Sequence, residues 1–276
     1  MRVLLRLILV VLLGAGAAGA PSLVAAQVTV QEVPTARQAI DATGFTGSVL
    51  VYDLATNSYR AGHAERVNRR LIPASTFKIL NSLIALETGV MTDANTVIKW
   101  DGVVRDRTEL NRDRDLQTAF RLSAVPHFQE LARRIGAERM QRFVDAVGYG
   151  NGDMSGGIDQ FWLTGGLRVS PREQVEFLSR LHRGDLPFSV ATMATVKAMM
   201  VAEQTEEHVI HAKTGLVVLP QGENVGWWVG WVERRGRVHV FATVLETTTP
   251  DQTFAPARQG VTRRVLGQLG VLSPAQ

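Results

Sequence analysis

Cysteine is absent from this 276-residue sequence, and its absence excludes two features. The chain cannot form a disulfide, so its stability outside the cytoplasm must come from packing alone. It also cannot carry a lipid on an N-terminal cysteine. The composition is otherwise ordinary, with 45% hydrophobic and 20% charged residues and no disordered or collagen-like bias. We therefore expect a globular protein with a full core in one or at most two domains.

Lysine is scarce, with four residues against 26 arginines, and clustered positive charge is missing. The formal net charge is only +4, and runs of basic residues stop at pairs such as Arg69-Arg70 and Arg234-Arg235. Nucleic-acid binding requires a basic patch or stripe on one face of a domain. We therefore expect no nucleic-acid partner, and we expect no metal site either.

The first 26 residues have the pattern of an export signal. Arg2 and Arg6 precede an apolar stretch over residues 7–19, and small residues at 24–26 form a cleavage site. We expect cleavage before Gln27, which leaves a domain of residues 27–276 with a net charge of +2. A membrane anchor is the alternative. The apolar stretch is short for a span and contains several glycines and alanines, so we expect no stable membrane span after cleavage.

The order of helical and strand patterns predicts an α/β protein of the α+β type. A hairpin is predicted where the strand Phe45–Asp53 meets the polar turn at 55–58. Predicted helices cover residues 35–42, 75–87, 128–135, 140–147, 171–183, 190–202 and 257–269, and predicted later strands cover 209–214, 225–233 and 238–246. No internal repeat or linker is visible. We expect one central, mostly antiparallel sheet built from both ends of the chain, flanked by helices and interrupted by an inserted helical region.

Ser75 and Lys78 are three residues apart on the apolar helix predicted over residues 75–87. Helical spacing places the hydroxyl and the amine on one face, within mutual reach. A nucleophilic serine needs a neighbouring base, and a helix N-terminus favours the negative charge that develops on the serine oxygen. A capping serine followed by a solvated lysine is the alternative, but this helix has hardly any polar face on which to expose the lysine.

A second motif, Lys213-Thr214-Gly215, ends the strand predicted over residues 209–214. It provides a cationic, hydroxyl-bearing edge strand that can hold a substrate carboxylate, while Gly215 leaves room for close approach. Two of the four lysines therefore occupy motif positions where arginine could not serve, because only lysine shifts its pKa enough to act as a base.

Together with Ser123-Ala124-Val125 between them, these motifs resemble the penicillin-recognising serine enzymes. Valine at position 125 is typical of class D (oxacillinase-type) serine β-lactamases, whereas class A enzymes and most penicillin-binding proteins have asparagine there. Further class D features are Pro73–Lys78, Tyr149-Gly150-Asn151, Phe161-Trp162-Leu163 and Gly226–Trp231. The resemblance covers about residues 45–270. It implies the β-lactamase fold and hydrolysis of the β-lactam ring of antibiotics, which confers resistance.

The resemblance implies that Ser75 is the nucleophile and that Lys78 carries a carbamate (N6-carboxylysine). Carbon dioxide or bicarbonate would form this carbamate, which serves as general base for acylation and deacylation, and no other cofactor is implied. The apolar pocket expected around Lys78 consists of Phe77, Val125, Trp162 and Leu163. Such a pocket would lower the pKa of Lys78 and leave a neutral amine able to attack carbon dioxide. Trp162 would donate its indole N–H to the carbamate, with plain core packing as its alternative role.

The resemblance also assigns the remaining site residues. The backbone N–H groups of Ser75 and Leu216 would form the oxyanion hole. Ser123, helped by Lys213, would pass a proton to the departing lactam nitrogen. The residues expected to bind the substrate and its carboxylate are Lys213, Thr214, Gly215, Leu216 and Arg258. The alternative for Arg258 is an ordinary surface arginine.

Some positions depart from the family pattern. Glu109-Leu110-Asn111 resembles the deacylation motif of class A, but Arg107 occupies the position of the class A base and the segment precedes the central serine motif. We interpret it as a solvated polar loop. Phe128 stands where relatives commonly carry tyrosine, and Leu110 and Leu216 stand where several carry aromatic residues. The preference among penicillins, oxacillin-type drugs, cephalosporins and carbapenems therefore stays open.

Two other functions share these motifs. A β-lactam sensor domain is acylated without turnover and is fused to a transmembrane signalling segment. A D,D-transpeptidase or carboxypeptidase would more often carry asparagine in place of Val125. For a β-lactamase with an export signal we expect a periplasmic location in a Gram-negative bacterium, as a monomer or a homodimer.

Overall fold

The computed structural model describes residues 29–219 and 224–273, so the signal segment predicted over residues 1–26 lies outside the described residues. A seven-stranded sheet has the order β1-β3-β2-β9-β8-β7-β6, and its neighbouring strands are antiparallel except β1 and β3. Its strands are β1 (Val30–Glu32), β2 (Thr46–Asp53), β3 (Ser58–Gly62), β6 (Val201–Gln204), β7 (Val209–Val217), β8 (Asn224–Arg234) and β9 (Arg237–Thr247). The predicted fold class is confirmed.

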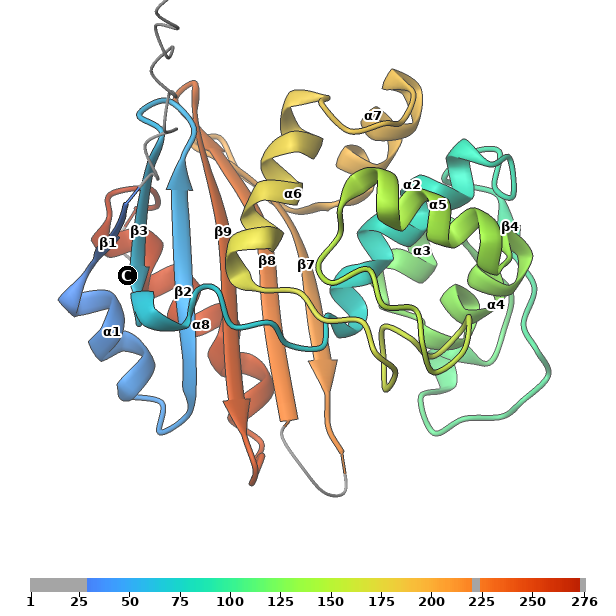
Figure 1. The fold of residues 1–276 in the computed structure, drawn as a ribbon, viewed down its shortest axis with the longest axis horizontal. Helices are drawn as coiled ribbons and strands as arrows, with labels where there is room; N and C mark the ends of the chain where they lie inside the picture. Colours follow the sequence, from blue (N-terminus) through green and yellow to red (C-terminus); the bar gives the residue numbers. More distant parts are fainter. Residues whose placement is uncertain (1–28, 220–223, 274–276) are drawn as a thin grey trace, which may run out of the picture.

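Helices cover both faces of the sheet and form a second lobe beside it (Figure 1). They are α1 (Pro34–Asp41), α2 (Lys78–Glu87), α3 (Leu116–Arg121), α4 (Val125–Ile135), α5 (Ala137–Val147), α6 (Pro171–Arg183), α7 (Val190–Met199) and α8 (Phe254–Gln268). Helices α1 and α8 pack on one face of the sheet, and α6 packs on the other. We call α2 to α5 with their connecting segments the helical lobe. Each face of the sheet has its own buried apolar cluster, and the larger one continues into the helical lobe.

Short elements complete the part of the chain that the structure describes. They are the 3₁₀ turns η1 (Ala64–Arg66), η2 (Ala74–Phe77) and η3 (Thr108–Leu110) and the two-stranded sheet of β4 (Val97–Ile98) and β5 (Arg114–Asp115). The β4–β5 pair closes the base of a loop over residues 99–113, which we call the 99–113 loop. Within residues 29–219 and 224–273 no helix combines the length and the apolar character needed to cross a bilayer.

Local chemistry explains the elements that were predicted well. Helix α6 begins with the predicted capping box, in which Ser170 and Glu173 exchange side-chain and backbone hydrogen bonds, and it ends at Gly184 in the left-handed conformation. Strand β8 is buried from Asn224 to Val232 because helices cover both faces of the sheet there. Its prediction as a central strand is confirmed.

Three predictions of local structure were wrong. The helix predicted to reach Ala202 ends at Met199, because the following residues pair with β7 as the edge strand β6. The strand expected to end at Thr214 continues to Val217. It is also not the edge of the sheet along its whole length. Strand β6 covers β7 only as far as His211, so the stretch from Lys213 onward keeps the open edge that the motif was predicted to provide.

Candidate active site

Ser75 lies on the 3₁₀ turn η2, which runs directly into α2 at Lys78. The side chain of Lys78 donates a hydrogen bond from Nζ to Ser75 Oγ at 2.7 Å. Side chains three residues apart eclipse one another in a 3₁₀ turn, so this tighter geometry aligns the pair even better than the predicted α-helix. Lys78 is completely buried, and Ser75 is 6% exposed at the surface.

The turn that presents Ser75 is held by one internal hydrogen bond and by bonds from two other elements. Thr76 Oγ1 donates to the carbonyl of Pro73 at 2.7 Å and accepts from Gln174 Nε2 on α6 at 2.8 Å. Trp227 on β8 donates its indole N–H to the carbonyl of Ile72 at 2.8 Å. These bonds fix the turn to the sheet and to α6, which pre-organises the nucleophile.

The surroundings of the Lys78 amine are aromatic. The rings of Phe77 and Trp162 are fully buried and stacked 5.4 Å apart, and Lys78 Nζ lies 5.4 Å from the ring centroid of Phe128. Burial, followed by the nearby charges of Lys213 and Arg107, holds the pKa of Lys78 well below its ordinary value. Phe128, which lies beside the amine, was not among the predicted pocket residues, whereas Phe77 and Trp162 were and are buried in the same apolar cluster.

Two expected members of this pocket are less enclosed. Val125 is the first residue of α4 and is only partly buried, and Leu163 is partly buried against the main apolar cluster. Phe128 lies one helical turn after Val125, a spacing that could have identified it as a pocket residue. The sequence pattern marks Phe128 only as a departure from the family near the site.

The indole N–H of Trp162 is a buried donor without a hydrogen-bond partner among the described residues. Buried N–H groups are rarely left unpaired in native proteins, because each costs about 1–3 kcal/mol when unsatisfied. An anion on the neighbouring lysine would supply the missing acceptor. The residues present therefore fit a carbamate.

Ser123, which lies shortly before α4, is in contact with Lys213 on strand β7. Lys213 Nζ donates to Ser123 Oγ at 2.9 Å and to the carbonyl of Thr214 at 3.0 Å. Burial, with a smaller contribution from the charge of Arg258, lowers the pKa of Lys213 to about 7. Ser123 has a φ of 54°, a left-handed conformation that costs a non-glycine residue about 1–3 kcal/mol and that the surrounding structure must hold. The structure thus brings the two predicted motifs together.

Gly215 allows β7 to approach the turn that carries Ser75. A Cβ at this position would lie 3.0 Å from the carbonyl oxygen of Pro73 and 3.1 Å from Cγ2 of Thr76. Glycine at this position therefore permits the close approach of β7 to the η2 turn, while its predicted role in making room for the substrate stays a prediction. Leu216 follows on the open part of β7, and its side chain is exposed.

Arg258 reaches the same strand from the start of α8. Its Nη1 donates to the carbonyl of Gly215 at 2.9 Å, and its buried Nε has no partner among the described residues. Burial lowers the pKa of Arg258 to about 10, so the guanidinium remains charged at neutral pH. This placement does not fit the alternative of an ordinary surface arginine.

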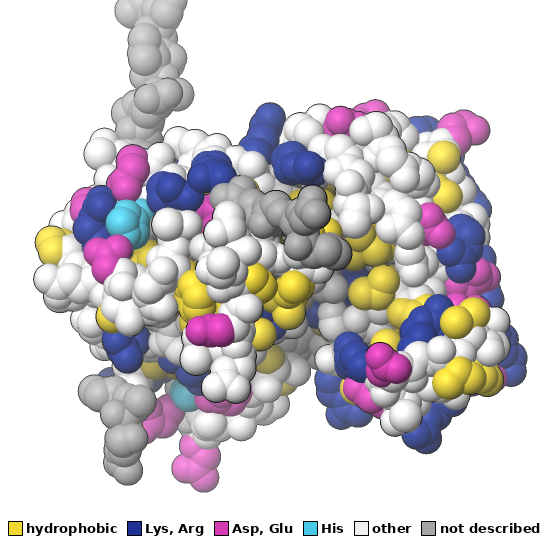
Figure 2. Space-filling model, turned by 90° about the horizontal axis from the view of Figure 1, so that it is seen from below, with side chains coloured by type: hydrophobic (Ala, Val, Ile, Leu, Met, Phe, Trp, Pro, Cys, Tyr) yellow, Lys and Arg dark blue, Asp and Glu magenta, His cyan; other side chains and the backbone are white. Residues whose placement is uncertain are grey.

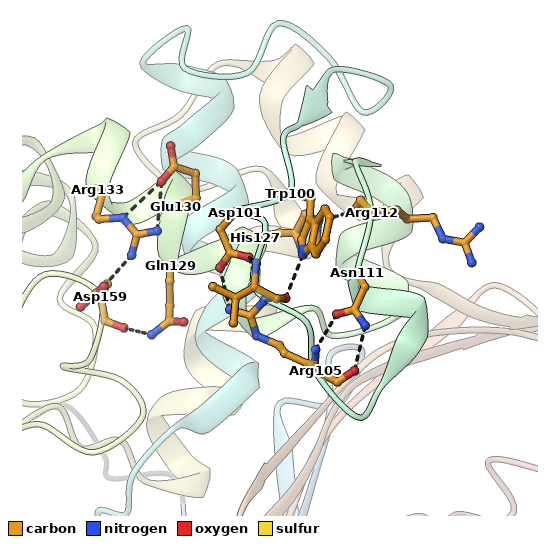
Figure 3. A network of polar contacts seen from close by, with 11 residues as sticks. Trp100, Asp101, Arg105, Asn111, Arg112, His127, Gln129, Glu130, Arg133 and Asp159 are labelled. Carbon is orange, nitrogen blue, oxygen red and sulfur yellow. Dashed lines mark hydrogen bonds and ion pairs between the residues drawn. The ribbon is translucent and has the colours of Figure 1, made fainter.

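A polar network joins the segment before Trp162 to helix α4 (Figure 3). Gln129 Nε2 donates to the carbonyl of Asp159 at 3.1 Å, and Arg133 pairs with the Asp159 carboxylate at 2.6 Å. Arg133 also pairs with Glu130 on its own helix. Helix α4 therefore presents Phe128 to the lysine and anchors the segment that carries Trp162.

The Tyr149-Gly150-Asn151 motif stabilises the other end of that segment. Asn151 Nδ2 donates to the carbonyl of Gly166 at 3.0 Å, and Asn151 Oδ1 accepts from the Arg168 N–H at 2.8 Å. Gly150 has a φ of 58°, and a Cβ there would lie 2.1 Å from the carbonyl oxygen of Arg168. This motif is structural, since it closes the loop that positions Trp162.

The Glu109-Leu110-Asn111 segment has a structural role. Asn111 exchanges hydrogen bonds with the backbone of Arg105, and Glu109 accepts from Arg107. Both belong to the polar surface that was predicted. Leu110, however, is buried in the main apolar cluster, so the description of this segment as a solvated loop was wrong at that residue. The charge of the nearby Arg107 contributes to lowering the pKa of Lys78. The sequence motifs gave no indication of this effect.

The surface is hollowed between the sheet and the helical lobe, and apolar side chains gather along this hollow (Figure 2). A pocket with a volume of about 360 Å³ is lined by Lys213 and Thr214 together with Phe120, Met200 and Trp228. Strand β7 therefore borders a cavity that is large enough for a small molecule.

Ser75 is hydrogen-bonded to a buried lysine and Ser123 to a second lysine, and Arg258 lies behind the open edge of β7. This arrangement brings together the motifs that resemble those of the penicillin-recognising serine enzymes. Comparison with known proteins agrees. Residues 45–267 match the family model described as "Penicillin binding protein transpeptidase domain".

Individual relatives give the class. The chain is 42% identical over 222 residues to β-lactamase OXA-48 of Klebsiella pneumoniae and 40% identical over 220 residues to β-lactamase OXA-5 of Pseudomonas aeruginosa. These alignments cover 80% and 79% of this chain and 83% and 82% of the relatives. Its structure superposes on the class D β-lactamase YbXI from Nostoc with a TM-score of 0.82 at 42% identity, covering 86% of this chain and 99% of that one. The chain belongs to the class D β-lactamases.

Proposed function

We propose that this class D β-lactamase hydrolyses the β-lactam ring of antibiotics through an ester formed on Ser75. The observation that carries this proposal is the 2.7 Å hydrogen bond between Lys78 Nζ and Ser75 Oγ inside a buried pocket. A nucleophilic serine requires an adjacent group that accepts its proton. Burial favours the neutral amine of Lys78, on which such a proton-accepting group can form. The antibiotics are the substrates, and hydrolysis confers resistance to them.

We further propose that Lys78 carries a carbamate formed from carbon dioxide. Two observations support this: the pKa of Lys78 is lowered, mainly by burial, which leaves a nucleophilic amine, and Trp162 offers a buried N–H without another partner among the described residues. When present, the carbamate supplies the general base for acylation and deacylation. Phe77 and Phe128 exclude bulk water from its surroundings.

The chain's own groups divide the remaining work. Ser75 Oγ attacks the lactam carbonyl, and the backbone N–H groups of Ser75 and Leu216 bind the oxyanion that forms. Ser123 Oγ accepts a hydrogen bond from Lys213, so the hydroxyl proton of Ser123 is free to be donated to the departing lactam nitrogen. A charged Lys213 then replaces that proton through the existing hydrogen bond.

The substrate carboxylate binds at the open part of β7. Thr214 supplies a hydroxyl there, and Arg258 supplies a guanidinium that stays charged because its pKa is about 10. Lys213, whose pKa is about 7, is only partly charged without substrate. A bound carboxylate favours its charged form, so substrate binding also prepares the proton that Ser123 relays.

We also propose that the first 26 residues export the protein and that it acts in the periplasm of a Gram-negative bacterium. The positive N-terminal residues, the apolar stretch and the small-residue cleavage site support this proposal. N-terminal sequencing of protein recovered from an osmotic-shock fraction tests it, with Gln27 as the expected first residue.

Hydrolysis of a chromogenic cephalosporin by the purified protein tests the function. We expect many turnovers, activity that falls when bicarbonate is removed, and loss of turnover in Lys78→Ala. Lys99→Ala is the matched control, because Lys99 is an exposed lysine paired with Asp113 on the 99–113 loop. A single equivalent of product would establish the sensor function instead. Bicarbonate-independent turnover that survives Lys78→Ala would contradict the mechanism.

A further inference from the structure

A second cavity lies at the end of the sheet that carries the β2–β3 and β8–β9 turns (Figure 1). Its volume is about 380 Å³, and residues 269–271, which follow α8, form part of its wall. We call it the arginine pocket, because its remaining lining residues are Asp53, Arg60, Arg234, Arg235, Arg237 and His239.

The strand register explains why these side chains converge. It pairs Arg234 with Arg237, His239 with Asp53, and Arg60 with Val51, which is two residues before Asp53. Paired residues share a face of the sheet, and so do residues two apart on one strand. The charged and titratable side chains of these strands therefore share the face on which α1 and α8 pack.

The arginine pocket is separate from the active site. On β8, Trp228 pairs with Thr214 of the active site, and Arg234 lies six residues further along the strand. A strand rises about 3.3 Å per residue, so the two positions are roughly 20 Å apart. A small molecule cannot contact both sites at once.

Two of the four arginines already have acidic partners. Arg237 donates to the Asp53 carboxylate, and Arg234 donates to Glu207 at 3.0 Å. His239 Nε2 faces the same Asp53 carboxylate at 3.6 Å. Burial, together with the charges of the nearby arginines, keeps the pKa of His239 below its ordinary value despite Asp53, so the imidazole is neutral at pH 7.

The positive charge of the arginine pocket is not balanced. Arg60 and Arg235 form no hydrogen bond or ion pair with any residue that the structure describes. Two polar atoms, Nε of Arg234 and Nδ1 of His239, are buried and also have no partner among those residues. Buried polar atoms are rarely left unpaired in native proteins. The pocket therefore offers unused charge and unused polar atoms to an anion.

We propose that the arginine pocket binds a phosphate group, carried by a small soluble molecule or by a lipid headgroup. Guanidinium groups form parallel, charge-assisted hydrogen bonds to phosphate oxygens. The arginines come from β3, the end of β8, the start of β9 and the turn between them, so together they can contact several oxygens of one phosphate. A volume of about 380 Å³ also leaves room for the rest of a small molecule.

Isothermal titration calorimetry with inorganic pyrophosphate tests the proposal. We expect binding that weakens about threefold to fivefold in Arg60→Gln, because this substitution removes one accessible ion pair with the phosphate. Arg264→Gln is the matched control, since Arg264 is exposed on α8 and does not line the pocket. The control should leave the affinity for pyrophosphate unchanged.

Arg235→Asn separates binding from folding. Arg235 has a φ of 51° and Gly236 a φ of 72°, so they form a type I′ turn between β8 and β9, where asparagine is favoured at the first position. The substitution should weaken pyrophosphate binding about threefold to fivefold, while the melting temperature stays the same or rises. Hydrolysis of the chromogenic cephalosporin should be unchanged, because the active site lies elsewhere.

Vesicles distinguish the two sources of phosphate. Sedimentation with phosphatidylglycerol vesicles that is lost in Arg60→Gln would identify a lipid headgroup, whereas pyrophosphate binding without such sedimentation would identify a soluble molecule. Unaltered pyrophosphate affinity in both Arg60→Gln and Arg235→Asn, an equal fall in Arg264→Gln, or no binding of either probe would overturn the proposal.

Discussion

Replacing Trp162 with phenylalanine removes one buried N–H group and leaves an aromatic ring in its place. That N–H has no partner among the described residues, and we propose that it donates to the carbamate on Lys78. A hydrogen bond to a charged group contributes about 1.5–3 kcal/mol. Trp162→Phe should therefore raise the bicarbonate concentration needed for half-maximal activity about 10- to 150-fold.

The same substitution should affect folding differently. Without bicarbonate, removal of an unsatisfied donor offsets part of the cost of the smaller ring, so the free energy of unfolding should fall by less than the lost ring volume alone would cause. With saturating bicarbonate the variant should be clearly less stable than the unaltered enzyme, because only the latter gains the hydrogen bond. Thermal unfolding at both bicarbonate concentrations measures this difference.

Trp231→Phe is the control for loss of a buried indole. Trp231 is also fully buried, but its N–H already donates to Glu233 at 2.9 Å on the same strand. We expect it to lose stability at every bicarbonate concentration and to keep the normal bicarbonate dependence of activity. If Trp162→Phe shows the bicarbonate dependence of the unaltered enzyme, Trp162 does not hold the carbamate and the reasoning fails.

Three further substitutions or conditions test other parts of the site. Gly215→Ala should lower kcat/KM about tenfold or more, because the added Cβ would lie 3.0 Å from the Pro73 carbonyl oxygen and displace β7 from the Ser75 turn. Steady-state kinetics with the chromogenic cephalosporin measures this change. Unaltered kinetics would show that the close approach of β7 is not needed. Asp159→Asn should lower the free energy of unfolding by about 0.5–1 kcal/mol and raise the bicarbonate requirement, since it weakens the pairing with Arg133 that anchors the segment before Trp162. A loss of stability with an unchanged bicarbonate requirement would show that Asp159 contributes to folding alone. Between pH 7 and about pH 10 the unfolded chain binds a proton at Lys213 that the folded protein has released, because the folded pKa is about 7 against an ordinary value of 10.5. Lys213 should therefore make the free energy of unfolding rise by about 1.4 kcal/mol per pH unit in this window, and Lys213→Met should remove that slope in denaturant titrations; an identical slope in both proteins would contradict the lowered pKa.

The sequence was sufficient for the parts of the fold that are set by local patterns. The capping box at Ser170, the glycine at 184 and the apolar run around Trp228 each specify an element through neighbouring residues. Strands β1 and β6 were not predicted, because their pairing depends on partners far along the chain. The three-residue strand β1 pairs with β3, and β6 takes residues whose own pattern continues a helix.

The sequence predicted the reactive residues of the site more completely than the residues that surround them and hold them in place. Ser75, Lys78, Ser123 and Lys213 lie together as their motifs indicated, in two hydrogen-bonded pairs. What the motifs could not reveal is distance through space. Three residues next to the site are far in sequence from the groups that they contact. Phe128 on α4 lies beside Lys78, Trp227 on β8 bonds to the residue before the η2 turn, and Arg107 on the 99–113 loop bonds to the residue before Ser123. Only the packing of these elements brings them close to the site.

The central claim is that Lys78 carries the carbamate that activates Ser75. Carbon-13 NMR of the protein equilibrated with ¹³C-labelled bicarbonate tests it most directly. We predict a carbamate resonance that is present in the unaltered enzyme and in Ser75→Ala, is absent in Lys78→Ala, and grows with bicarbonate in parallel with activity. An enzyme that turns over the chromogenic cephalosporin at full rate without any such resonance would contradict the account.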